Sequence, residues 1–443
     1  MPCSWVTSAV VRQQSITRRA GSTLYSVVNG LRVSGRLGHP SSGTPVLPAR
    51  WPPGWTSEIK YFVWVGAICM LMQFSMSGRT VLYGTMHHML SEKFDRSFNS
   101  LNAVRLLMAV GVIFWHSFPL TGNDLEQGPL RQFLGHAWVD GFFAISGFLI
   151  TGAWLSKPQV RHYVVNRLLR ILPAFYVCLF VTALVIAPFG VFMQGGDWRG
   201  LLASSAPLEY IGANFGVWIF QSGIGDTPEG IPYPGTWNGS LWTLGWELLC
   251  YIGVLALGAA GLLRRSMTIP LVFAAALAGL SLCTIVTMPF LFEAASRFAV
   301  MFLAGALIFQ FQHRIPCSWP VVGIATAITA AAMWLPDYRV VGALTWAYVV
   351  LSVGALVKYR PIEMKTWDIS YGVYIYAFPI QQLLIIAGLT TAHPVLFGAL
   401  ATLPTVVFAL LSRRFIELPA MKLKDPLGGR RIPPARVGQD GPQ

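Results

Sequence analysis

Residues 101–118 read LNAVRLLMAVGVIFWHSF, an apolar run that contains one arginine, Arg105, and one histidine, His116. A run of this length is about what an α-helix needs to cross ~30 Å of hydrocarbon. Similar runs recur regularly as far as residue 412. The sequence therefore predicts an all-α membrane protein with about ten transmembrane helices. We expect the spans at 101–118, 138–156, 171–190, 241–261, 269–288, 298–312, 319–335, 340–357, 369–389 and 395–412.

The composition supports contact with lipid and excludes several function classes. Of the 443 residues, 54% are hydrophobic and only 11% are charged, whereas soluble domains carry roughly 25% charged residues. The net charge of +14 does not indicate a nucleic-acid partner, because the Lys and Arg residues lie between the apolar runs. Cytoplasmic loops and anionic lipids account for that placement. The six cysteines are scattered without CxxC spacing, so we expect neither a disulfide framework nor a zinc site. We expect no other metal and no bound cofactor.

The charges of the loops predict the orientation of the chain in the membrane. Basic residues gather in alternate loops, and acidic or neutral loops lie between them. Since cytoplasmic loops are rich in Lys and Arg, both ends of the core are expected in the cytoplasm. A weaker stretch at 210–221 is predicted to be a re-entrant or surface helix, because an eleventh span would break the alternation. The basic loops are Lys157–Arg170, Arg264–Arg265, His313–Arg314, Lys358–Lys365 and Arg413–Lys424.

Residues 1–94 differ in character from the rest of the chain. Residues 11–55 are rich in Arg, Ser, Gly and Pro without periodicity, which predicts disorder. No signal-peptide pattern is present at the N-terminus, and the apolar stretch 61–76 is short for a span. Two explanations stay open at this point. The segment is a native basic extension, or the start codon is mis-assigned and translation begins at Met86 or Met89.

Arg105 and His116 are ionisable groups inside an expected span, which makes each a functional candidate. Ten residues separate them, so they lie about 20° apart around the helix and roughly 16 Å apart in depth. Arg105 would face the cytoplasmic side and His116 the external side. A histidine there titrates near neutrality and can serve as a general base. The structural alternatives are an arginine that reaches the headgroups and a histidine that caps the interface.

Two carboxylates are expected at the same external level as His116. Asp140 opens the second span and Glu247 lies one to two turns into the fourth. A carboxylate beside the imidazole would fix its tautomer and stabilise its charged form. For Asp140 the alternative is a helix N-cap, and for Glu247 it is a contact with substrate. We take His116, Glu247 and Asp140 as the candidate catalytic residues.

Arg167 and Arg170 lie one turn apart at the cytoplasmic start of the third span. Residues at this spacing share a helix face. Two neighbouring guanidinium groups suit phosphate, because their donors match the geometry of the oxyanion. The alternative is ordinary positive charge on a cytoplasmic loop.

Six short segments in order resemble the acyltransferase-3 superfamily of membrane O-acyltransferases. The resemblance covers the expected core, residues 97–415, and leaves 416–443 as a cytoplasmic tail. Each segment is weakly specific alone, but their common order and spacing are specific. The segments are Leu101–His116, Gly141–Thr151, Arg167–Pro173, Ser240–Glu247, Asp368–Ile380 and Arg413–Pro419.

The resemblance implies an enzyme that transfers acyl groups other than amino-acyl groups. The donor would be acyl-CoA, most often acetyl-CoA, supplied from the cytoplasm. Arg167 and Arg170 would hold the CoA phosphates, Arg105 would line the channel, and His116 would activate the acceptor hydroxyl. The acceptor would be a carbohydrate or a similar hydroxyl compound of the cell envelope, modified by a multi-pass protein of a bacterial-type inner membrane.

This chain departs from the family pattern at three places. Asn102 stands where the family usually has Asp. Glu247 is followed by Leu248, whereas the family often has a second acid, and Tyr376-Ala377 replaces the usual Trp-His. These changes affect auxiliary roles and leave the arginines and His116 in place.

The main alternative is a multi-span transporter or flippase of a polar solute. Transporters often consist of two halves with similar hydropathy, and residues 100–250 show no correspondence with 270–415. A structural or sensory protein would leave the pairing of Arg105 with His116 unexplained. Aromatic residues of the external loop either stack on sugar rings or form an interfacial belt. They are Trp198, Tyr210, Trp218, Tyr233 and Trp237.

Overall fold

The computed structural model describes residues 88–95, 98–358 and 368–424. These residues form helices and loops, with no β-strand among them. Most of the predicted extension, including 61–76 and Met86, lies outside the described residues, as does the end of the predicted tail from residue 425. The prediction of an all-α protein is confirmed.

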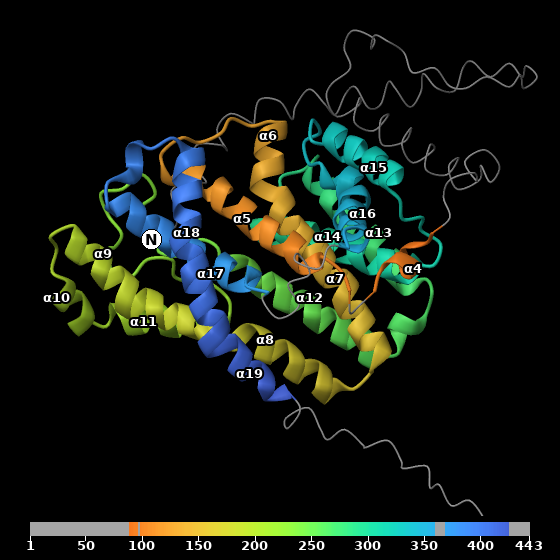
Figure 1. The fold of residues 1–443 in the computed structure, drawn as a ribbon, viewed down its shortest axis with the longest axis horizontal. Helices are drawn as coiled ribbons and strands as arrows, with labels where there is room; N and C mark the ends of the chain where they lie inside the picture. The colour runs from red at the N-terminus through yellow and green to blue at the C-terminus, as the bar shows by residue number, and fades with distance from the viewer. Residues whose placement is uncertain (1–87, 96–97, 359–367, 425–443) are drawn as a thin grey trace, which may run out of the picture. The chain divides into compact units, whose positions relative to one another are not determined.

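Figure 1 shows the helices, which are numbered along the chain. They are α4 (Leu90–Lys93), α5 (Leu101–Leu120), α6 (Pro129–Gln132), α7 (Trp138–Ser156), α8 (Val160–Val181), α9 (Ala187–Met193), α10 (Trp198–Ala203), α11 (Ala206–Asn214), α12 (Trp242–Ala259), α13 (Thr268–Cys283), α14 (Phe290–Phe311), α15 (Trp319–Ala332), α16 (Arg339–Leu356), α17 (Ser370–Ile386), α18 (Pro394–Ser412) and α19 (Leu418–Lys422).

Seven helical segments of the described chain are long and apolar enough to cross a membrane, and α13, α15 and α17 are shorter apolar helices. Together they cover all ten predicted spans. The protein is therefore a multi-pass integral membrane protein, and its orientation stays a prediction. The seven segments are Leu101–Leu120, Pro129–Ser156, Val160–Met193, Trp242–Ala259, Phe290–Phe311, Arg339–Leu356 and Pro394–Lys422.

Three of these long segments contain a π-helical turn, η1 (Phe133–Ala137), η2 (Thr182–Ile186) and η6 (Arg413–Glu417). A π turn holds an extra residue and changes the direction of nearby side chains, and such turns are frequent at functional sites. In this chain η1 carries His136 and η6 carries Glu417. Both residues take part in the contacts described below.

The closest helix packing joins α7 to α14 and depends on two glycines. A Cβ atom on Gly147 would lie 1.8 Å from the carbonyl oxygen of Phe302, and one on Gly305 would lie 1.9 Å from that of Ala144. Small residues of this kind let two membrane helices approach closely. Gly147 belongs to the motif segment Gly141–Thr151, so this part of the motif allows α7 to pack closely against α14.

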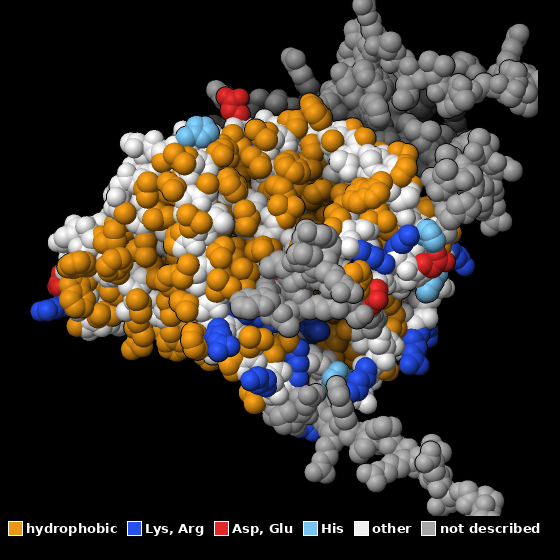
Figure 2. Space-filling model, in the orientation of Figure 1, with side chains coloured by type: hydrophobic (Ala, Val, Ile, Leu, Met, Phe, Trp, Pro, Cys, Tyr) orange, Lys and Arg blue, Asp and Glu red, His pale blue; other side chains and the backbone are white. Residues whose placement is uncertain are grey.

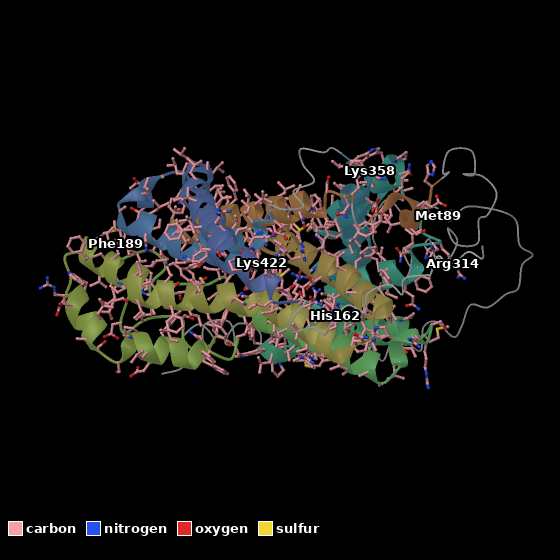
Figure 3. The ribbon with its side chains drawn as sticks, turned by 60° about the horizontal axis from the view of Figure 1, so that its bottom comes forward. Met89, His162, Phe189, Arg314, Lys358 and Lys422 are labelled. Carbon is pink, nitrogen blue, oxygen red and sulfur yellow. The ribbon has the colours of Figure 1, made fainter. Side chains whose placement is uncertain are left out.

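Apolar side chains dominate the face of the molecule that Figure 2 shows, as expected for a surface against lipid. Lys and Arg side chains gather toward the lower and right edges of that view. In Figure 3, His162, Arg314 and Lys358 likewise lie far from Phe189, which is at the opposite end of the drawing.

The stretch 210–221 forms a shorter helix than predicted. Helix α11 begins earlier and ends at Asn214. The side-chain oxygen of Asn214 accepts hydrogen bonds from the backbone amides of Phe220 and Gln221, at 2.9 and 3.1 Å. Val217 has a φ of 64°, which a helix does not permit. These features turn the chain back before it could form a span.

Two other boundaries differ from the prediction. Helix α14 begins at Phe290 rather than at 298. The prediction missed its first two turns because two charged residues, Glu293 and Arg297, interrupt the apolar pattern there. On the N-terminal side, described residues before 97 already contact the core. Leu90 in α4 is fully buried, and its amide donates a hydrogen bond of 2.9 Å to the carbonyl of Ile315. Helix α4 therefore packs against the helices of the core through Leu90.

Candidate active site

A cavity of about 260 Å³, here called the inner cavity, lies among α5, α7, α8, α12 and α17. Five of the six motif segments contribute to its wall, and the sixth reaches it through Glu417, which pairs with a wall residue. Motifs that are far apart in sequence thus meet at one place. Its charged wall residues from these segments are Arg105, Arg167, Arg170, Glu247 and Asp368.

Asp368 and Glu417 form ion pairs with two of the three arginines of the inner cavity, Arg105 and Arg170. Arg170 donates a hydrogen bond to the carboxylate of Asp368, and its Nη1 lies 3.6 Å from Oε2 of Glu417. Nη1 of Arg105 lies 3.9 Å from Oδ2 of Asp368. Burial raises the pKa of the Asp368 carboxyl, but Arg170, Arg105 and hydrogen bonds from Ser370 outweigh that effect and lower it to about 2.

Arg167 lies in the same wall and differs from its neighbours. It forms no ion pair within the described part of the chain, and its buried Nε has no hydrogen-bond partner there. Its guanidinium carbon lies 6.0 Å from the centre of the Tyr251 ring. Of the three arginines predicted to bind the donor, Arg167 is thus the one without an ion pair among the described residues.

Glu247 faces the inner cavity rather than His116. Its Oε1 accepts hydrogen bonds from the Ser146 hydroxyl, at 2.8 Å, and from the Tyr251 hydroxyl. Ser146 belongs to the motif segment Gly141–Thr151 and Glu247 to the segment Ser240–Glu247, so this hydrogen bond joins two motifs. It also holds the carboxylate in the wall between α7 and α12.

His116 lines a second cavity of about 180 Å³, here called the outer cavity. Its ring packs edge to face against Phe378, with centroids 5.0 Å apart. The Nδ1 atom of His116 is buried and has no hydrogen-bond partner among the described residues. Neither Asp140 nor Glu247 is hydrogen-bonded to it, so the expected carboxylate beside the imidazole is not seen in this structure.

The two cavities share part of their walls. Val139, Thr243 and Tyr374 line both of them, and the Thr243 and Tyr374 hydroxyls are hydrogen-bonded to each other. The cavity with the arginines and the cavity with His116 are therefore adjacent. Arg105 near the start of α5 lines one, and His116 near the end of that helix lines the other, as their predicted depths require.

Asp140 lies in a buried ion-pair network away from the lining of the outer cavity. Its Oδ2 accepts hydrogen bonds from the Tyr338 hydroxyl, at 2.6 Å, and from Nε of Arg339, at 2.7 Å. Arg339 also pairs with Asp337 at 2.9 Å. The helix runs through Asp140 without a break from α6 and η1, so Asp140 is not an N-cap either. In this position it joins α7 to the start of α16.

Arg297 and His136 line the outer cavity, although the sequence had not singled out either residue. Nη2 of Arg297 lies 3.2 Å from Nδ1 of His136. Arg297 seemed to precede its span because α14 was predicted to begin at 298. His136 seemed to belong to a loop, since nothing in the apolar pattern marks the π turn that carries it.

The aromatic residues of the long loop that is predicted to be external divide into core and surface residues. Trp237 and Tyr210 are fully buried, and Tyr233 is exposed. The buried pair cannot stack on a sugar. Two other tryptophans, Trp115 and Trp242, line the outer cavity.

Residues 98–414, well over half of the chain, match a family model described as an acyltransferase domain. The chain belongs to the acyltransferase-3 family. It is also similar to two named proteins, at 28% identity to nodulation protein 10 of Rhizobium leguminosarum bv. viciae and at 26% to an O-acetyl transferase of Shigella phage Sf6. The matches cover 75% and 73% of this chain and 96% and 98% of those proteins. No solved structure matches the chain.

The protein is therefore a membrane acyltransferase. The family match includes both cavities, because their described walls lie within residues 98–414 except for two residues of the inner rim, Met421 and Lys424. Membership favours acyl transfer over the transporter alternative, which rested only on the number of spans and a polar interior.

Proposed function

We propose that this acyltransferase moves an acyl group, most often acetyl, from acyl-CoA in the inner cavity to a hydroxyl group of an acceptor in the outer cavity. One observation carries the proposal above the others. The inner cavity, which is lined by three arginines, is adjacent to the outer cavity, which is lined by His116, and the two cavities share three wall residues. Donor and acceptor can thus approach from opposite sides of the membrane.

The donor is assigned to the inner cavity because of its charge. CoA carries several phosphate charges, and guanidinium groups bind phosphate through paired hydrogen bonds. Arg167 has no ion pair among the described residues and is available to a phosphate, while Arg105 and Arg170 are paired with Asp368. The inner cavity lies at the ends of α5, α8 and α17 that are predicted to face the cytoplasm, where acyl-CoA is made.

His116 is assigned as the general base because its imidazole lines the outer cavity with Nδ1 unpaired. It takes the proton of the acceptor hydroxyl as that oxygen attacks the carbonyl carbon of the thioester. General base catalysis of this kind contributes about 10²–10⁴ in rate. The thioester must reach the shared wall at Thr243 and Tyr374 for this attack.

The acceptor is assigned as a carbohydrate or a related hydroxyl compound of the cell envelope. The similar phage protein is named an O-acetyl transferase, and Trp115 and Trp242 supply aromatic faces in the outer cavity. We place the protein in the cytoplasmic membrane of a bacterial-type cell.

The test is mass spectrometry of envelope carbohydrate from cells that produce the full-length protein, its His116→Gln variant, or neither. We expect an O-acyl group that is present only with the wild-type protein. Identical acylation in all three samples would overturn the proposal, provided that immunoblots show equal amounts of the two proteins in the membrane.

A further inference from the structure

We propose that Arg297 and His136 form an anion site in the outer cavity that binds a negatively charged oxygen next to His116. The oxygen belongs either to the tetrahedral intermediate of acyl transfer or to a carboxylate of the acceptor. The proposal rests on the proposed function and adds an anion-binding site to the general base already assigned to the outer cavity. It depends on the position of Arg297, the absence of an ion pair to it among the described residues, and its contact with His136.

The position of Arg297 follows from the true start of α14. Because the helix begins at Phe290, Arg297 lies two turns inside it and its side chain reaches the wall of the outer cavity. The guanidinium lies against two aromatic rings, 4.9 Å from the centre of Phe298 and 5.9 Å from that of Trp242. Stacking of this kind holds the planar guanidinium in one orientation.

The charge of Arg297 has no carboxylate partner within the described residues. Arg105, Arg170, Arg339 and Arg413 each form an ion pair there, whereas the polar contact of Arg297 in the same residues is with His136, and its buried Nε has no hydrogen-bond partner among them. A buried charge without a counter-ion is strongly unfavourable. Asp140 and Asp337 act on Arg297 from a longer distance, and an anionic ligand in the outer cavity would supply the direct partner that the guanidinium lacks.

The contact with His136 determines the state of that histidine. Arginine can only donate hydrogen bonds, so Nδ1 of His136 must accept one from Nη2 of Arg297. The imidazole is then neutral with its proton on Nε2. His136 cannot supply the missing negative charge, and its Nε2–H adds a second donor to the wall of the outer cavity.

The chemistry of acyl transfer creates an anion at this place. The acceptor oxygen bonds to the thioester carbonyl carbon and gives its proton to His116, and the carbonyl π electrons move onto the carbonyl oxygen. Arg297 and His136 donate hydrogen bonds to that oxyanion. When the carbonyl re-forms, the carbon–sulfur bond breaks and the CoA thiolate takes the proton from His116. Loss of one such oxyanion donor slows catalysis by about 10²–10³-fold.

The test compares the full-length protein in nanodiscs with its Arg297→Gln and Arg297→Ala variants. Single-turnover transfer is measured from radiolabelled acetyl-CoA to a deacylated envelope-carbohydrate extract, together with acetyl-CoA binding. Arg131→Gln is the matched control, because Arg131 stacks on Trp115, 5.7 Å from its ring centre, but donates to the Leu125 carbonyl instead of lining the cavity. We expect wild-type transfer from the control.

We expect Arg297→Gln to bind acetyl-CoA as the wild type does and to transfer about 10²–10³-fold more slowly. Added methylguanidine should raise the rate of Arg297→Ala at least severalfold, because it restores the missing donor. Wild-type transfer by Arg297→Gln would overturn the proposal. So would the absence of rescue, or loss of acetyl-CoA binding in both variants, since Arg297 would then act through the fold.

Methyl esterification of the carboxylates in the extract separates the two sources of the anion. If the oxyanion of the intermediate binds at Arg297, the wild type transfers equally to both extracts. If the acceptor carboxylate binds there, esterification slows the wild type to the rate of Arg297→Gln. His116→Gln tests the proposed function independently: wild-type transfer by that variant refutes the base assignment, and the result for Arg297 still stands.

Discussion

The inner and outer cavities share three wall residues but differ in how their charges are paired, although Arg167 of the inner cavity also has no ion pair among the described residues. In the inner cavity, Arg105 and Arg170 are balanced by Asp368 and by Glu417 behind it. In the outer cavity, neither the Nδ1 atom of His116 nor the guanidinium of Arg297 has a carboxylate partner among the described residues. The balanced groups keep the inner cavity in shape, while the unbalanced groups are suited to act on a substrate.

The comparison predicts that a substitution of His116 reduces the rate of acyl transfer more than any other of the proposed substitutions. Replacing His116 by Gln removes the base but keeps a polar side chain of similar size. We expect the turnover number for acyl transfer to fall by about 10²–10⁴-fold, with unchanged affinity for acetyl-CoA, because the donor binds in the other cavity. Single-turnover and binding measurements check this, with the exposed His313→Gln as control. A loss of acetyl-CoA affinity as large as the loss of turnover would show that donor binding and base catalysis are not separated between the two cavities.

Asp368 tests whether balanced charge maintains the inner cavity. Asp368→Asn leaves Arg105 and Arg170 without their main counter-charge, and breaking a buried pair costs about 3–5 kcal/mol. We expect a clearly lower thermal transition in detergent. The lowered pKa of about 2 means that this stabilisation is fully present above the unfolded-state pKa near 4 and is lost as the pH falls toward 2. The difference between variant and wild type should therefore be constant from pH 5 to 8, and a difference that changes within that range would contradict the account.

Substitutions of Arg167 and Arg170 should have different effects, although the two residues were assigned the same role from the sequence. Arg167→Gln removes the charge without a partner, so we expect acetyl-CoA affinity to fall by about 10–100-fold, as for a hydrogen bond to a charged group. Arg170→Gln disturbs the pairs with Asp368 and Glu417 and should mainly lower stability. Isothermal titration and thermal shift measurements on both variants decide this, and the opposite pattern would reverse the two roles.

The smallest expected change in the rate of transfer comes from substitutions in the wall that the two cavities share. Tyr374→Phe removes the hydrogen bond to Thr243 but keeps the ring between the cavities. A neutral hydrogen bond contributes about 0.5–1.5 kcal/mol, so we expect a change of at most about tenfold in the rate of transfer. Thr243→Val removes the same bond from the other side and should give a similar change. A double variant no slower than either single one would show that the bond itself is responsible.

The sequence predicted the fold well because apolar run length and loop charge depend only on local composition. It also predicted the separation in depth of Arg105 and His116, which follows from helix geometry. It failed where partners come from distant segments. The contact of Asp140 with Arg339 joins positions 199 residues apart, and no local pattern indicates it. Arg297 was missed because two charges mask the start of α14, and His136 because a π turn carries it.

The most direct test of the account is the sidedness of transfer. Membrane vesicles of both orientations, containing the full-length protein, receive radiolabelled acetyl-CoA on the outside only, with deacylated carbohydrate extract inside. We predict labelled carbohydrate in the lumen of inverted vesicles, where the cytoplasmic side faces out, and none in right-side-out vesicles or with His116→Gln. Labelling in right-side-out vesicles, or equal labelling with His116→Gln, would contradict a donor in the inner cavity and a base in the outer one.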